Sequence, residues 1–78
     1  MYTIEDEYNA WYAWKSADDA WQAELVRVYK AMAGDARYSY KLSIATPELE
    51  RLHTAFRDAR AAYYDIREDR VNAALQNL

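Results

Sequence analysis

The amino-acid sequence predicts an all-α protein in which two long antiparallel helices form a hairpin. Three observations lead to this expectation. Residues 3–33 and 46–78 both repeat apolar side chains at steps of three and four, which is the period of an α-helix. Each stretch opens with residues typical of a helix N-terminus. Opposite charges also fall at positions that would face each other if the two stretches packed as an antiparallel hairpin. We therefore expect one domain spanning residues 1–78, with helices at 3–33 and 46–77 and a linker at 34–45.

The first helix is expected to begin after Thr3, an N-cap residue whose capping-box partner is Asp6 three positions later. Its apolar stripe occupies an arc about 60° wide at 100° per residue. The members of this stripe are Trp14, Trp21, Leu25, Val28 and Met32. Gly34, the single glycine, stands where a C-terminal cap favours a positive φ. The first helix is therefore predicted to end near Ala33.

The second helix is expected to begin at Thr46 and Pro47. Threonine is a good N-cap, and proline fits the first helical position because its missing N–H has no partner there. The apolar stripe that follows is spaced 3-4-3-4-3. It consists of Leu49, Leu52, Phe56, Ala59, Tyr63 and Ile66. Each helix would be roughly 45 Å long at 1.5 Å per residue.

Residues 37–44 alternate polar and apolar side chains with period two, which is typical of a half-buried strand. A lone strand has no partner within an otherwise helical chain. Three interpretations stay open: an extended segment packed over the end of the hairpin, a strand that pairs with another chain, and a short extra helical turn. We expect the first, an extended and partly β-like linker.

Two acidic residues, Glu7 and Asp18, interrupt the apolar stripe of the first helix. Arginines fall on or beside the stripe of the second helix. A hairpin that turns near residues 38–40 places Glu7 opposite Arg70, and Asp18 opposite the turn that begins at Arg60. We interpret these charges as ion pairs that set the register of the two helices. A polar ligand pocket is the alternative.

The residue inventory argues against catalysis and metal binding. The chain has no cysteine, which excludes disulfides and thiolate zinc sites and fits a reducing compartment. His53 is the single histidine, so a chain-internal Ser-His-Asp triad is excluded. Glu50 and His53 have the Glu-x-x-His spacing of di-iron bundles, but the helical wheel points both away from the seam. We expect no enzyme activity, no cofactor and no metal.

The chain is expected to be cytoplasmic and to make no membrane contact. No apolar stretch approaches the roughly 20 residues that span a bilayer. The acidic start of the sequence differs from the basic start of a secretory signal. The isoelectric point near 5.0 argues against a general nucleic-acid binder.

Aromatic residues are too many for one narrow seam, with eight Tyr, three Trp and one Phe. Several lie off the stripe of the first helix or in the linker. Tyr, Trp and Arg are enriched at binding hot spots. The candidate binding residues are Tyr8, Trp11, Tyr12, Arg37, Tyr38, Tyr40 and Lys41. Since a two-helix hairpin is thin, we also expect a homodimer that completes a helical bundle. The face around Tyr8 would form either this dimer contact or a contact with a foreign protein.

These features predict a non-enzymatic protein-binding module that docks aromatic and charged helical surfaces onto a protein partner. In general character, the cysteine-free, aromatic-rich, acidic chain resembles the small accessory proteins that phages use to inhibit host machinery, anti-CRISPR proteins among them. This resemblance covers no specific motif and assigns no residue a role; it implies an inhibitor of a host or defence protein. Two alternatives stay open: a self-assembling structural subunit, and a binder of a small nucleotide-like ligand in an Arg/Tyr pocket between subunits.

Overall fold

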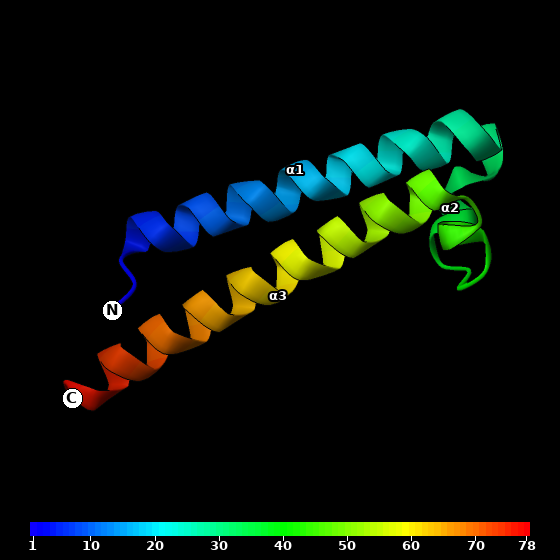
Figure 1. Ribbon diagram of the computed structural model, residues 1–78. Helices are drawn as coiled ribbons and strands as arrows, with labels where there is room; N and C mark the ends of the chain where they lie inside the picture. The colour runs from blue at the N-terminus through cyan, green and yellow to red at the C-terminus, as the bar shows by residue number, and fades with distance from the viewer.

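The computed structural model describes residues 1–78 and contains helices and turns but no β-strand. Two long helices, α1 (Ile4–Tyr29) and α3 (Pro47–Gln76), lie side by side and run in opposite directions (Figure 1). Between them lie a 3-10 turn, η1 (Lys30–Met32), a short helix, α2 (Ala33–Arg37), and a second 3-10 turn, η2 (Leu42–Ile44). This arrangement agrees with the predicted all-α architecture.

Both expected helix starts are present. The Thr3 hydroxyl accepts a hydrogen bond from the Asp6 N–H at 3.1 Å, and the Asp6 carboxylate accepts from the Thr3 N–H at 2.8 Å. The Thr46 hydroxyl accepts from the Leu49 N–H at 3.1 Å, and Pro47 fills the first position of α3. These contacts satisfy N–H groups that have no partner inside the helix, so they fix where each helix begins.

The first long helix ends earlier than the sequence predicts. It stops at Tyr29, and the chain turns at Lys30, which has φ 56° and ψ −123°. Gly34 does not have a positive φ and lies inside α2, so its predicted role as a C-terminal cap is wrong. The turn at Lys30 brings Ala33 and Ala36 into the core, where both are almost fully buried. Their small side chains allow α2 to pack closely against the long helices.

The predicted extended, β-like linker is also wrong, because the segment forms short helical turns. The Ser43 N–H donates to the Ser39 carbonyl at 2.9 Å, and the Leu42 N–H donates to the Ser39 hydroxyl at 3.2 Å. A lone strand would leave these donors unpaired, whereas turns pair them within the segment. The period-two pattern misleads because Tyr38 and Tyr40 are both highly exposed rather than half-buried.

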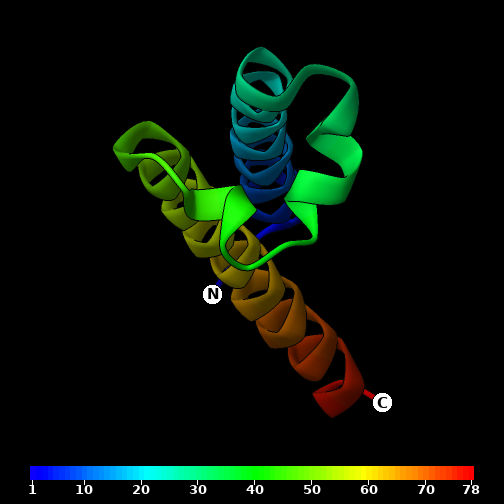
Figure 2. The same cartoon turned by 90° about the vertical axis from the view of Figure 1, so that its right-hand side faces the viewer.

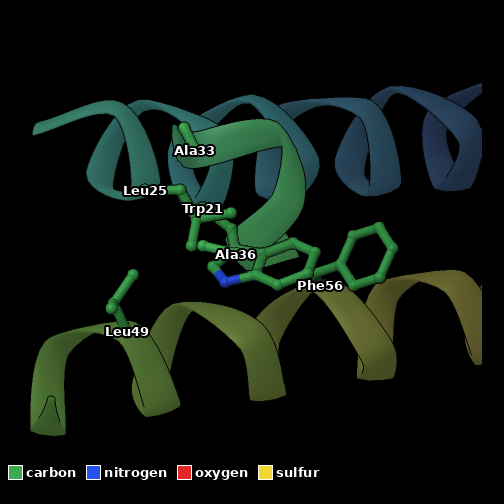
Figure 3. Packing of buried hydrophobic residues seen from close by; sticks show 6 residues of the cluster. All are labelled: Trp21, Leu25, Ala33, Ala36, Leu49 and Phe56. Atoms are coloured by element: carbon green, nitrogen blue, oxygen red, sulfur yellow. The ribbon is translucent and has the colours of Figure 1, made fainter. Parts of the chain in front are cut away.

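The hydrophobic core sits at the bend end of the hairpin, where three helices meet (Figure 3). Its members are Trp21, Leu25, Ala33, Ala36, Leu49 and Phe56. Ser43 is also buried, and its carbonyl accepts a hydrogen bond from the Trp21 indole N–H at 3.2 Å. The remaining length of α1 and α3 has only a two-helix seam.

The molecule is long and thin, measuring 49 × 20 × 19 Å. α2 and the turn that follows it lie beside the helix pair near the bend, while α1 and α3 separate toward the termini (Figures 1 and 2). An open cleft of about 820 Å³ lies in this wider part, between the start of α1 and Ile66 of α3. The accessible surface is 5760 Å². A compact monomer of 9.2 kDa exposes about 4,900 Å², so this shape leaves about 800 to 900 Å² of additional surface uncovered.

Candidate functional site

One side of the helix pair carries a groove lined by aromatic rings, here called the aromatic groove. It consists of Tyr8, Trp11 and Trp14 on α1 with Tyr63 and Tyr64 on α3. A cleft of about 230 Å³ lies between Glu7, Tyr8, Trp11 and Tyr63. A second cleft of about 120 Å³ lies between Trp11, Trp14, Lys15 and Asp18. The two clefts share Trp11, so they adjoin each other along the helices.

Tyr8 and Trp11 of the groove and Tyr12 at its rim contact each other and face solvent. The ring centroids of Tyr8 and Trp11 are 6.3 Å apart, those of Tyr8 and Tyr12 are 5.4 Å apart, and those of Trp11 and Tyr12 are 5.1 Å apart. The two contacts of Tyr8 follow from the i, i+3 and i, i+4 spacing on one helix, whereas Trp11 and Tyr12 are adjacent in the sequence. Tyr8 is 58% exposed, Tyr12 56% and Trp11 38%. The structure therefore brings these three candidate residues together in one exposed cluster.

The α3 rings close the other wall of the groove. The Trp14 ring lies 5.3 Å from Tyr63 and 5.6 Å from Tyr64 by centroid distance, and the two tyrosine rings are 5.3 Å apart. Trp14 and Tyr63 are partly buried in the seam, while Tyr64 is half exposed. Aromatic rings have few rotatable bonds, so this wall is a stiff surface.

The short helix α2 packs on the same side of the hairpin as the groove. Its last residue, Arg37, donates hydrogen bonds to Asp18 at 2.6 Å and to Gln22 at 3.0 Å. At 100° per residue, Trp11 and Lys15 point to the same side of α1 as Asp18 and Gln22. α2 therefore covers this face near the bend, and the aromatic groove continues it toward the termini without a cover.

Arginines of α3 flank the groove without carboxylate partners. Arg60 and Arg67 are absent from the five ion pairs of the molecule. The Arg60 guanidinium lies 5.1 Å from the centroid of the Phe56 ring. Arg67 lies with Tyr64, Glu68, Val71 and Asn72 around a shallow hollow of about 280 Å³. The α3 edge of the groove therefore carries two guanidinium groups with no carboxylate within 4.0 Å.

Glu7 and Arg70 form the ion pair that the sequence places between the helices. The Arg70 guanidinium donates to the Glu7 carboxylate at 3.2 Å, and the two side chains are 32% and 21% exposed. The Nε of Arg70 is buried and has no hydrogen-bond partner. This pair joins α1 and α3 beyond the apolar core.

The predicted pairing of Asp18 with Arg60 is wrong. Asp18 instead binds Arg37, whose guanidinium also lies 4.5 Å from the centroid of the Trp21 ring. The helix α2 supplies this nearer cation, which a two-helix picture lacks. Arg37, predicted as a binding residue, thus fastens α2 to α1.

The other linker candidates lie around a second hollow, here called the bend cleft. This cleft has a volume of about 400 Å³ between the chain after α2 and the first turns of α3. Its lining consists of Arg37, Tyr38, Ser39, Tyr40, Ser43, Ile44, Glu50, His53, Thr54 and Arg57. Tyr38 is 87% exposed and Tyr40 is 84% exposed. Lys41 is exposed and does not line the cleft.

His53 is a residue whose place in the bend cleft the sequence does not predict. Its ring lies 4.7 Å from Trp21 by centroid distance, and the side chain is partly buried. Burial lowers the pKa of His53, and the positive charges of Arg57, Arg60 and Arg37 lower it further. The expectation that His53 points away from the seam does not include the packing of the bend over this side of α3. The one feature of the sequence that indicates packing of His53 beside the core is its i, i+3 spacing from the core residue Phe56.

Comparison with protein families, with curated proteins and with solved structures found no match to this chain. No group of three or more His, Asp or Glu side chains is placed to hold a metal ion. None of the helices combines the length and the apolar character needed to cross a membrane. Of the candidate binding residues, Tyr8 and Trp11 line the aromatic groove, and Arg37, Tyr38 and Tyr40 line the bend cleft.

Proposed function

We propose that this protein is a non-enzymatic protein-binding module that takes up a helix of its partner in the aromatic groove. One observation supports the proposal: α2 covers this face near the bend, and the part beyond it presents exposed rings. A helix docked there would continue the layer that α2 begins and complete a three-helix arrangement. Apolar residues of the docked helix would bury the exposed parts of Tyr8, Trp11 and Tyr64.

The charges beside the groove define the chemistry of the partner helix. Arg60 and Arg67 have no carboxylate within 4.0 Å, so an acidic flank on the docked helix would find two free guanidinium groups. The partner is therefore an amphipathic helix with apolar residues at steps of three and four and Asp or Glu along one flank. Tyrosine and tryptophan suit such a contact because they bury large areas with little loss of side-chain entropy.

Within this proposal, the bound helix belongs to a host or defence protein, whose own contacts the module would block. The general likeness to small phage inhibitors supports this reading. We place the contact in the cytoplasm, since a cysteine-free chain needs no oxidising compartment to fold.

A photo-crosslinking experiment tests the proposal. A photoreactive phenylalanine analogue is placed at Tyr12, at Tyr64, or at Ala62, an exposed position on another face of α3. We expect Tyr12 and Tyr64 to crosslink to one amphipathic helical segment of one partner, and Ala62 not to. Equal crosslinking of that segment from all three positions would contradict the proposal. So would undiminished partner binding by the double variant Tyr8→Ala/Trp11→Ala.

A second candidate function, that of a self-associating structural subunit, is favoured by the uncovered surface. The excess of about 800 to 900 Å² over a compact monomer matches the roughly 800 Å² that each partner buries in a standard interface. In a dimer through the groove, an acidic residue of one α1 that has no ion pair within its own chain, such as Glu5, would approach Arg60 and Arg67 of the other copy. Light scattering coupled to size exclusion measures the mass. A dimer that Trp11→Glu converts to a monomer supports this candidate, and a monomeric wild type removes it.

A further inference from the structure

We infer that the bend cleft binds a nucleoside phosphate, with the phosphate beside Arg57 and His53 and the base against Tyr38 or Tyr40. This site is separate from the aromatic groove and does not depend on it. The cleft volume of about 400 Å³ falls within the range of about 300 to 1,000 Å³ typical of small-ligand sites.

The floor and one wall of the cleft are held rigidly by the core. His53 packs against Trp21, and the Trp21 indole donates a hydrogen bond to the carbonyl of Ser43. Arg37 is fixed by Asp18 and by its place over the Trp21 ring. The part of the cleft at His53 and Arg37 is therefore preformed.

The cleft favours an anion at one end. The three charged groups that act most strongly on His53 are all arginines: Arg57, Arg60 and Arg37. Arg37 is neutralised by Asp18, but Arg57 and Arg60 have no carboxylate within 4.0 Å. The Arg57 side chain is exposed and lines the cleft, so its guanidinium can form charge-assisted hydrogen bonds to a phosphate.

Other features of the cleft favour a ring system attached to the anion. Tyr38 and Tyr40 are highly exposed, and no aromatic side chain stacks on either ring. Both rings offer a flat face to a nucleobase. Glu50 is the single carboxylate of the lining, and it would repel a bare phosphate but can accept hydrogen bonds from the N–H groups of a base. A ligand that carries both a phosphate and a base therefore fits these lining residues better than a phosphate or a base alone.

Calorimetric titration of the full chain tests the inference, with uridine and adenosine monophosphates, the matching nucleosides, and inorganic phosphate as probes. We expect saturable binding of a monophosphate that is stronger than that of its nucleoside and of phosphate. A short single-stranded oligonucleotide forms a separate arm. Tighter binding of the oligonucleotide identifies a strand as the source of the nucleotide, and tighter binding of the monophosphate identifies a free ligand.

Matched variants assign the binding to the cleft. Arg57→Gln should weaken monophosphate binding about tenfold, the value of one strong charge-assisted contact. Arg51→Gln is the control, because Arg51 lies on the same helix, pairs with Glu48 and does not line the cleft. Tyr38→Ala combined with Tyr40→Ala should remove the preference for nucleotide over phosphate, and the two Phe substitutions should keep it. The inference is overturned if no monophosphate binds saturably, or if Arg57→Gln and Arg51→Gln bind alike.

Discussion

The Arg37 guanidinium lies 4.5 Å from the centroid of the Trp21 ring and donates a hydrogen bond of 2.6 Å to Asp18. One side chain thus joins the end of α2 to the core and to α1. It also separates the two candidate sites, because Asp18 borders the aromatic groove while Arg37 lines the bend cleft. The position of α2 therefore matters for both surfaces.

Replacing Arg37 should loosen α2. We expect Arg37→Met to lower the free energy of unfolding by about 2 to 3 kcal/mol, since it removes two side-chain hydrogen bonds and the cation–π contacts with Trp21 and Phe56. Arg37→Lys should recover only part of the loss, because an ammonium lacks the planar fork. Urea unfolding measures both. Arg51→Met, which breaks an exposed ion pair, serves as the control and should change stability little. Similar losses for the two methionine variants would argue against this role of Arg37.

The backbone conformation at Lys30 and at Gly34 predicts the effects of one substitution at each position. Lys30→Gly should stabilise the fold by about 1 kcal/mol, because φ 56° with ψ −123° suits glycine and strains a side chain. Gly34→Ala should also stabilise it by about 1 kcal/mol, since alanine favours a helix and the added methyl meets no atom within 4 Å. Each change should raise the melting temperature by about 4 to 8 °C. If Gly34→Ala lowers it instead, glycine 34 has the capping role that the sequence suggests.

The local parts of the fold can be predicted from the sequence because their determinants lie within a few residues. The capping contacts at Thr3 and Thr46 each span three residues. The position of α2 depends on a positive φ at Lys30, which the residue type disfavours. The alternation in residues 37–44 is real, but exposure of Tyr38 and Tyr40 shows that periodicity alone does not determine burial.

For the candidate sites too, contacts within one helix could be predicted from the sequence, and contacts between distant segments could not. Tyr8, Trp11 and Tyr12 cluster as their spacing on one helix indicates. The partner of Asp18 and the place of His53 both depend on packing of the bend against α1 and α3. Such contacts join residues far apart in the sequence, so a helical wheel of either long helix does not contain them.

The ion pair between Glu7 and Arg70 predicts a strong coupling of two substitutions. Arg70→Leu alone should destabilise the protein by about 1 to 3 kcal/mol, because it leaves a partly buried carboxylate without its partner. Adding Glu7→Leu should recover part of this loss, since two apolar side chains can pack across the seam. A double-mutant cycle of unfolding free energies measures the coupling. Additivity within about 0.5 kcal/mol would show that the pair does not link the helices.

The exposed rings at the aromatic groove and its rim should respond to substitution differently from the partly buried ring of Tyr63. Tyr8→Gln and Tyr12→Gln remove rings that are more than half exposed, so stability should change by less than about 1 kcal/mol. Tyr63→Ala removes a partly buried ring that packs on Trp14, and it should cost about 3 kcal/mol. Thermal unfolding distinguishes the two groups. Large losses at Tyr8 and Tyr12 would assign their rings to the fold rather than to a binding surface.

Protonation of His53 should weaken the fold in mild acid. Burial and the charges of Arg57, Arg60 and Arg37 lower the pKa of this residue, so the unfolded chain binds the proton more readily than the folded chain. The contribution of His53 is therefore fully present above the unfolded pKa of about 6.5, falls as the pH drops below that value, and stops changing below the folded pKa. Unfolding free energies at about pH 7.5 and pH 5.5 measure this loss. His53→Gln removes the titrating group, and the difference between the two pH values should shrink in this variant. If wild type and His53→Gln lose equal stability between the two pH values, the loss belongs to other groups, and His53 titrates alike in the folded and unfolded chain.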